Sequence, residues 1–251
     1  MYTGCWLGCH RVGEQAKTAR YGRDREWRLF PVTVRIARDL WSQLEVGMDG
    51  TNTRLERMRA TLCREAAVLQ ELADDFDEGA SRAVDLLLGT SGHVLIGGAG
   101  TSNAVAWRFA HLLSCCGLPA LFLDPAEGLH GGSGAVKPED TVILISKEGG
   151  SREVNAFGLI VKQRGARLMA MTEAPDSELG KMADAVVRVK IRSGSDPFDM
   201  VATSSSLANA AAADAICEVV LVERGQTKEA FGATHPAGAV GERMRREGIL
   251  K

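Results

Sequence analysis

A short apolar run that ends in glycines and then in hydroxyls occurs twice in this chain. The first copy, V-L-I-G-G-A-G-T-S, covers Val94 to Ser102, and the second, T-V-I-L-I-S-K-E-G-G-S, covers Thr141 to Ser151. Each run predicts a buried strand that leads through a tight loop into a helix. Glycine lets the backbone approach a ligand, and the N-terminus of the following helix favours an anion. Two such loops in one small domain indicate a sugar-phosphate site.

The first loop departs from the dinucleotide-binding pattern. G-G-A-G-T-S does not fit G-x-G-x-x-G, and Asp124, the acid near the expected offset, is followed by Pro125. The formal net charge of -2 gives no reason to expect nucleic acid or an anionic membrane surface as a partner. No run of about 18 apolar residues is present, which predicts no membrane-spanning helix, and no secretory signal begins the chain. We therefore expect a cytoplasmic protein that needs no cofactor.

The six cysteines do not indicate a metal site. Cys5 and Cys9, with His10, resemble half of one, but no second half follows. His130 follows Glu127 closely, and no third ligand is evident there either. The cysteines on apolar helical stretches are typical of buried thiols in a reducing compartment. These are Cys115, Cys116 and Cys217.

The N-terminal segment, residues 1–47, differs from the rest because it is rich in arginine and holds three of the four tryptophans. It is either an arm that packs on a partner subunit or an upstream extension absent from the working protein. We favour the second interpretation, with Met48 or Met58 as the functional start, since a clean helical pattern begins at Thr51. The expected domain is then 48–251.

The remainder predicts an α/β fold. Apolar residues at three- and four-residue spacing indicate two helices with one apolar stripe between Thr51 and Leu88. Strands that are apolar throughout then alternate with helices, which indicates a parallel, doubly wound sheet that binds ligands at the carboxyl ends of its strands. The expected strands are His93–Gly97, Ala120–Leu123, Thr141–Ser146, Arg167–Thr172 and Ala185–Ile191. The expected helices are Ser102–Cys116, Ser151–Arg164, Ser177–Ala183, Met200–Arg224 and a piece from Gly238 on, with a loop and short helical turn over Pro125–Gly134.

Five motifs in chain order extend this interpretation. They are V-L-I-G-G-A-G-T-S, D-P-A-E-G-L-H-G-G, I-S-K-E-G-G-S-R-E, T-S-S-S before an alanine-rich helix, and T-H-P-A-G-A-V-G-E-R. In that order they resemble the sugar isomerase (SIS) domain over roughly residues 55 to 245, with the arabinose-5-phosphate isomerase group as the closest match. The resemblance implies a flavodoxin-like five-stranded parallel sheet with N-terminal helices. It also implies a phosphosugar site completed by a neighbouring subunit of a homodimer or homotetramer. Members of that group often carry a pair of C-terminal regulatory domains, which we expect this chain to lack because it ends at Lys251.

Short hydroxyls at loop-to-helix junctions can donate to phosphate oxygens, although serine and threonine also favour such positions as helix N-caps. The substrate-binding candidates are Gly98, Gly100, Thr101, Ser102, Glu127, Ser146, Lys147, Ser151, Thr203, Ser204 and Ser205.

Isomerisation of an aldose phosphate requires a base beside the carbonyl carbon and a donor for the enediolate oxygen. The resembling isomerases place the histidine of T-H-P-A-G, His235 here, at an active site for ring opening or proton transfer. The alternative is a surface or interface histidine. His130 and Glu127 would lie near the ligand. The catalytic candidates are His235, Glu148, Glu153 and His130.

The chain also departs from the isomerase pattern. That pattern has lysine where Thr101 stands, serine at Glu148, and glutamate at Gly150 and near Gly194. A carboxylate about 4 Å from a phosphate charge costs about 4 kcal/mol at an effective dielectric near 20.

Three explanations of Glu148 follow. It points away, or Lys147 offsets it, or it has become the base, with Glu153 as the competing base. Asp196 or Asp199 could replace the acid missing near Gly194.

Two functions from different classes remain. The first is a phosphosugar isomerase that interconverts an aldose and a ketose phosphate through an enediolate, with a pentose phosphate favoured by the resemblance. The second is a non-catalytic SIS module that senses a phosphosugar, which the missing lysine and carboxylates favour. A nucleotide-sugar or amino-sugar enzyme is a third, weaker interpretation.

Overall fold

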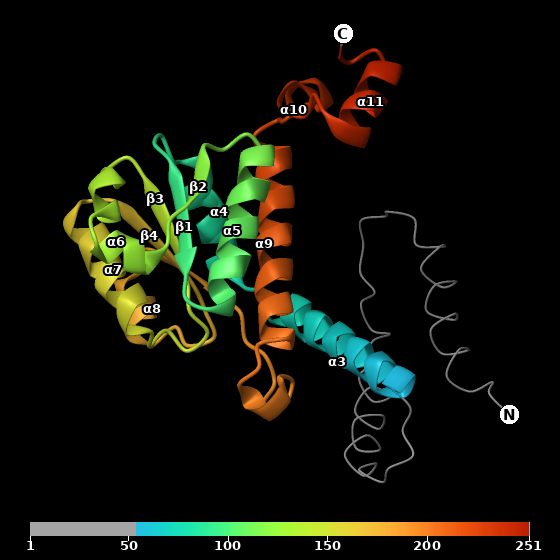
Figure 1. Cartoon of the computed structure of the whole chain (residues 1–251). Helices are drawn as coiled ribbons and strands as arrows, with labels where there is room; N and C mark the ends of the chain where they lie inside the picture. Colours follow the sequence, from blue (N-terminus) through green and yellow to red (C-terminus); the bar gives the residue numbers. More distant parts are fainter. Residues whose placement is uncertain (1–53, 251) are drawn as a thin grey trace, which may run out of the picture. The chain divides into compact units, whose positions relative to one another are not determined.

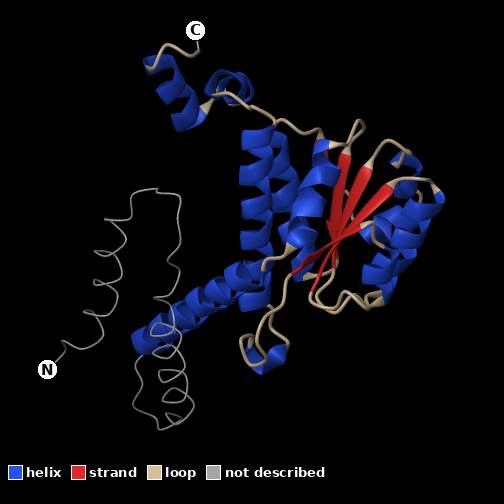
Figure 2. Ribbon diagram, turned by 180° about the vertical axis from the view of Figure 1, so that it is seen from behind, coloured by secondary structure: helices blue, strands red, loops and turns tan. Residues whose placement is uncertain are grey.

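The computed structural model describes residues 54–250, so the predicted extension over 1–47 lies outside the described residues. Five parallel strands form one sheet in the order β2-β1-β3-β4-β5 (Figures 1 and 2). This order confirms the predicted flavodoxin-like, doubly wound sheet. The strands are β1 (Val94–Gly98), β2 (Ala120–Phe122), β3 (Thr141–Ile145), β4 (Arg167–Thr172) and β5 (Ala185–Arg188).

The helices cover both faces of the sheet. Before the sheet come α3 (Arg54–Asp75) and α4 (Glu78–Leu88). The connections between strands carry α5 (Thr101–Cys115), α6 (Pro125–Leu129), α7 (Arg152–Gln163) and α8 (Glu178–Met182). After the sheet follow α9 (Ser204–Glu223), α10 (Lys228–Thr234) and α11 (Gly238–Arg246). Two short 3-10 turns complete the list, Gly132–Ala135 and Pro197–Asp199.

Side chains of alternating strand residues pack into two separate hydrophobic cores, one on each face of the sheet. Ile143 and Ile145 pack on one face of the sheet with residues of α3, α4, α5 and α9. Val142 and Leu144 pack on the other face with α7 and α8. Because β3 is buried on both faces, its sequence is apolar without interruption, as the parallel-sheet prediction required.

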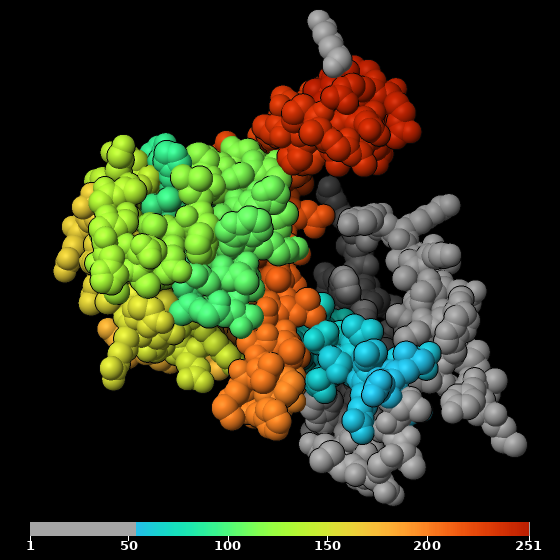
Figure 3. All heavy atoms as spheres, viewed as in Figure 1, coloured from blue at the N-terminus to red at the C-terminus, as the bar shows by residue number. Residues whose placement is uncertain are grey.

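The last long helix begins later than the sequence pattern predicts. Met200 and Val201 are apolar and suggest helix, but α9 starts at Ser204. Phe198 and Asp199 have positive φ angles of 57° and 53°, a conformation that cannot continue an α-helix. The preceding turn is therefore a separate, exposed feature, visible in orange in Figure 3.

The sequence pattern misses α10, and it mislocates the ends of several elements. α10 is only seven residues long, and its last residue is followed by His235. β5 ends at Arg188 rather than at Ile191, and β2 at Phe122 rather than at Leu123. Short elements at the ends of a fold have too few periodic residues to fix their limits.

The apolar stripe predicted for the first helix is only partly buried. Val68 and Leu72 are buried, but Leu55, Met58 and Leu62 are more than half exposed in the single chain. The outer half of α3 therefore presents apolar side chains that the described part of the chain does not cover.

Among the described residues, α9 is long and apolar enough to meet the length and composition criteria of a membrane-crossing helix. Core helices meet the same criteria. In this fold α9 packs along α5 and contacts α3 and α4 (Figure 1). Asp214 and Glu218 interrupt its apolar sequence, so the helix contains no long uninterrupted apolar run.

Candidate functional site

The strand order brings the two glycine-serine loops together. β1 and β3 are neighbours, with Gly98 paired to Ile145 at their carboxyl ends. From β1 the chain enters α5, which packs in one core, and from β3 it enters α7, which packs in the other. The two connections leave the sheet on opposite faces, which opens a crevice between them.

A pocket of about 400 Å³ occupies this position. Three serines, a lysine and a glutamate line it, together with an alanine, a glycine and an isoleucine. The lining residues are Ala99, Ser102, Ile145, Ser146, Lys147, Glu148, Gly150 and Ser151. The pocket therefore unites five of the predicted site residues from two segments about 45 positions apart.

Glycine is required at two points of the first loop. A Cβ on Gly98 would lie 2.9 Å from the Cβ and backbone atoms of Ser102, so only glycine allows the first turn of α5 to pack there. Gly100 has φ 57°, which glycine adopts without strain. Both glycines shape the loop that leads to Ser102, one of the residues that line the pocket.

The hydroxyls of the second loop are not used as helix caps. Ser151 is the N-cap residue of α7, but its side chain makes no capping hydrogen bond. Its Oγ lies 3.2 Å from Oγ of Ser146 instead, so the two hydroxyls form a pair at the pocket. A serine that occupies the N-cap without capping is available to a ligand.

The hydroxyl cluster formed by Thr203, Ser204 and Ser205 does not line this pocket. Ser204 and Ser205 are buried, and both donate to groups of the protein: Ser204 Oγ to the Ser195 carbonyl at 2.9 Å, and Ser205 Oγ to Asp196 Oδ2 at 2.6 Å. Thr203 Oγ1 is buried without a hydrogen-bond partner in the described part of the chain. The hydroxyls of Ser204 and Ser205 thus donate within the protein, and their contacts with a substrate remain predictions.

Asp196 links this cluster to the pocket. Its carboxylate accepts from the backbone N–H of Ser205 at 3.0 Å and from Lys147 Nζ at 3.3 Å. Burial opposes the ionisation of Asp196, but the hydrogen bonds from Ser205 and Lys147 outweigh it and lower the pKa. Lys147 is thus held against Asp196, not against Glu148.

Two further carboxylates lie at the same edge of the sheet. Glu148 is exposed and is one of the residues that line the pocket. Glu173 directly follows β4, and its backbone N–H donates to the Lys147 carbonyl at 2.9 Å. Burial raises the pKa of the Glu173 carboxyl, Lys147 opposes this, and Glu148 and Asp196 reinforce it. Sequence reasoning missed Glu173, although an acid directly after an apolar strand was the available signal.

Several predicted residues do not line the pocket. Thr101 is exposed at the start of α5, and Glu127 and His130 are exposed on and just after α6. Glu153 is half-buried in the first turn of α7. Their predicted roles remain predictions.

His235 lies at the far end of α5 from the pocket. Its Nε2 is 3.5 Å from Cys115 Sγ, and Nδ1 is 2.9 Å from the Phe231 carbonyl. Because Ser102 and Cys115 are 13 residues apart on one helix, about 20 Å of helix axis separates the two places. Within one chain, His235 cannot act on a ligand held by Ser102.

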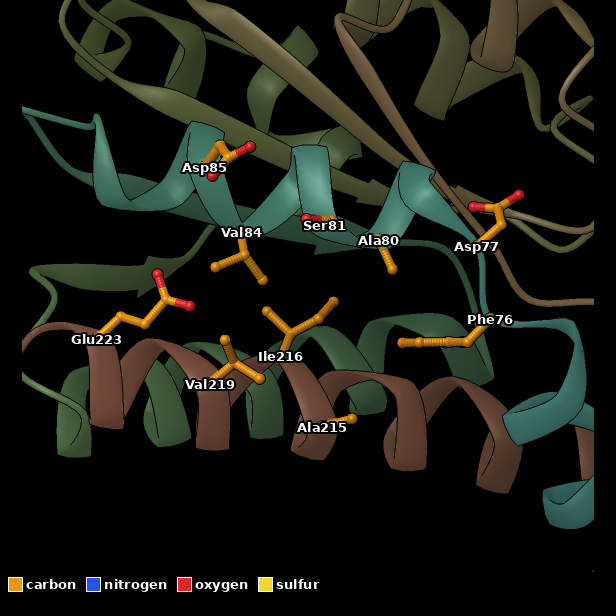
Figure 4. Close-up of a pocket in the computed structure, with 10 residues that line it drawn as sticks. All are labelled: Phe76, Asp77, Ala80, Ser81, Val84, Asp85, Ala215, Ile216, Val219 and Glu223. Carbon is orange, nitrogen blue, oxygen red and sulfur yellow. The ribbon is translucent and has the colours of Figure 1, made fainter. Parts of the chain in front are cut away.

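A second pocket of about 330 Å³ lies between α4 and α9 (Figure 4). Val84 projects from α4 towards Ile216 and Val219 of α9, and Glu223 lies at one end. None of the predicted site residues contributes to it. Among the described residues, no group of three or more histidine, cysteine, aspartate or glutamate side chains is placed to hold a metal ion.

These features define a doubly wound α/β protein with a hydroxyl-lined pocket where its strand order reverses. The chain belongs to the SIS domain family, whose model matches residues 87–217.

Three similar proteins are informative. The "Arabinose 5-phosphate isomerase GutQ" of Salmonella typhi is 35% identical over 182 residues, which cover 72% of this chain and 56% of that protein. A solved structure from Listeria monocytogenes, described as a candidate sugar-phosphate isomerase, has a TM-score of 0.72 and 33% identity, and the match covers 76% of this chain and all of that one. An Escherichia coli protein solved in complex with arabinose 5-phosphate has a TM-score of 0.71 and 26% identity, with coverages of 75% and 100%. The chain thus spans little more than half the length of the curated relative.

Proposed function

We propose that this protein is a sugar-phosphate isomerase that interconverts an aldose phosphate and a ketose phosphate. The observation that carries the proposal is the pocket between β1 and β3, in which Ser102, Ser146 and Ser151 meet Lys147. Short hydroxyls and one cation at the carboxyl edge of a parallel sheet suit a phosphorylated polyol. The names of the similar proteins support the same class of substrate.

The mechanism we propose passes through an enediolate, with a pentose phosphate as the favoured size class. Ser102, Ser146 and Ser151 hold the phosphosugar by donating to its oxygens. Lys147 supplies positive charge in the pocket, in place of the lysine that the resemblance puts at Thr101. His235 serves the pocket of a neighbouring subunit of a homo-oligomer, because its own pocket is out of reach. A cytoplasmic location belongs to this proposal as well.

The test is turnover by the purified full-length chain on a panel of pentose and hexose phosphates, with ketose formation as the readout and no added nucleotide. We expect turnover of at least one aldose phosphate. Ser102→Ala should raise KM because it removes a donor from the pocket. Ser81→Ala, in the second pocket, is the matched control and should leave KM unchanged.

The sensor function is the second candidate, and it is supported by an acidic residue, Glu148, in the lining of the pocket. A thermal-shift measurement with the same panel separates the two. If a sugar phosphate stabilises the protein but no compound in the panel is turned over, the sensor function replaces the isomerase function as the proposal.

A further inference from the structure

Lys147 and Glu173 are neighbours at the carboxyl ends of two adjacent strands, β3 and β4. Ile145 of β3 pairs with Met171 of β4, and both side chains belong to the core under α5 and α9. Two positions on, Lys147 and Glu173 lie just beyond the ends of these strands. The Glu173 N–H donates to the Lys147 carbonyl at 2.9 Å, one residue out of the strand register, and the charge of Lys147 acts on the Glu173 carboxyl.

The Lys147 side chain extends towards the start of α9. Its ammonium reaches Asp196, whose carboxylate is held by Ser205 in the first turn of α9. The Lys147 side chain is about one-third exposed, while that of Asp196 is buried. The Lys147 ammonium is therefore held by Asp196, while part of the side chain stays exposed and Lys147 lines the pocket.

The three acids around Lys147 are not equivalent. Asp196 is committed to three donors, and its lowered pKa makes it a weak base. Glu148 is exposed to water. Glu173 is half-buried, and its carboxylate has no hydrogen-bond or ion-pair partner within residues 54–250.

We propose that Glu173 is the acid–base residue of the isomerisation, with Lys147, positioned by Asp196, as the cation that stabilises the enediolate. The inference rests on the proposed isomerase function and names its base. It replaces Glu148 and Glu153, the candidates taken from sequence.

The proton balance of the step closes without a co-reactant. The Glu173 carboxylate takes the proton from C2 of the open-chain aldose phosphate, the C2–H electron pair forms the C1=C2 bond, and the carbonyl pair moves onto O1. The hydroxyl proton on O2 passes to O1 beside the Lys147 ammonium. The O2 electron pair then forms the ketone, and the C1=C2 pair takes the proton back from Glu173 at C1.

Half-burial suits Glu173 to this role. A base works best when its pKa approaches the working pH, and burial moves the pKa of Glu173 upward in that direction. The charged groups that face it are Lys147 and Glu148 from the second loop, Asp196 from the turn before α9, and Lys190 after β5. The carboxylates raise its pKa further and the two lysines limit the rise.

The experiment compares wild type with Glu173→Gln, Glu173→Asp, Glu148→Gln and the control Asp176→Asn, an exposed acid in the same loop. We expect Glu173→Gln to lower kcat about 100- to 1,000-fold with KM nearly unchanged. Glu173→Asp should recover part of kcat, and Glu148→Gln should lose less than about tenfold. The acidic limb of the wild-type pH–rate profile should disappear in Glu173→Gln and persist in Asp176→Asn.

Binding is followed separately by the thermal shift that inorganic phosphate produces, which Glu173→Gln should retain. A Glu173→Gln protein that keeps more than about a tenth of kcat, or that keeps the acidic limb, overturns the assignment while the isomerase function stands. A wild-type protein without turnover overturns the isomerase function and this inference together. If Glu173→Gln does not fold, as judged by circular dichroism, Glu173→Asp decides the matter: unchanged kcat and an unshifted acidic limb would overturn the assignment.

Discussion

Replacing Asp196 by asparagine removes one charge from the best-connected polar side chain of the site. Asp196 Oδ1 accepts from the Ser205 N–H, and Oδ2 accepts from Ser205 Oγ and Lys147 Nζ. In Asp196→Asn the amide oxygen can keep the backbone bond. Ser205 Oγ can rotate and accept from the new NH₂ group, but Lys147, which has only donors, loses its partner.

The expected loss of stability follows from the number of hydrogen bonds that the substitution removes. One charge-assisted hydrogen bond is lost, and the exposed side of Lys147 regains water, so the expected loss of unfolding free energy is about 1–2 kcal/mol. For a domain of this size that corresponds to a fall of about 2–8 °C in Tm. The control is Asp199→Asn on the same turn, where asparagine tolerates the positive φ of 53°.

The effect should depend on pH in a defined direction. Because the pKa of Asp196 is lowered in the folded protein, its stabilisation is present above the unfolded value of about 3.9 and is lost as pH falls through the folded value. Urea unfolding followed by circular dichroism at pH 7, 5 and 3.5 measures the difference. Equal urea midpoints for wild type and Asp196→Asn at pH 7 would refute the role of Asp196 as anchor of Lys147.

Three further outcomes are expected. Gly98→Ala should abolish the thermal shift by inorganic phosphate and lower stability by about 1–3 kcal/mol, since its Cβ would lie 2.9 Å from Ser102. Ser151→Ala should change the free energy of unfolding by less than about 0.5 kcal/mol, because no cap is lost, yet raise KM in the isomerase assay. An equimolar mixture of inactive His235→Ala and Glu173→Gln subunits, refolded together, should regain about a quarter of wild-type turnover if dimers share their sites; no recovery would argue against sharing.

The sheet and its ligand edge were predictable because they depend on local signals. Val94 and Thr141 each begin an apolar run long enough for one buried strand, and the glycines after each run mark its carboxyl end. The alternation of strands and helices then leaves few topologies, of which the observed order is one. The pairing of the two loops in one pocket follows from that order.

The details around Lys147 were not predictable, because they depend on register and on a turn. That Glu173 lies beside Lys147 depends on the pairing of β3 with β4, which no local pattern reveals. Asp196 is adjacent to a turn with positive φ angles, so its distance from Ser205 could not be judged from sequence separation. The place of His235 depends on how the last helices fold back, and its contact with Cys115 has no signature in sequence.

The length of α5 has a consequence for symmetry. One end of this helix carries the hydroxyl pocket and the other end carries His235, about 20 Å away. If His235 acts in the pocket of another subunit, each chain contributes two different half-sites to its assembly. In a dimer with a two-fold axis, the pocket of each subunit would meet His235 of the other, which gives two identical complete sites. In a head-to-tail arrangement, the subunits would have to form a closed ring for every pocket to receive a histidine. The rigid rod between the half-sites would then set the spacing of the active sites in the assembly.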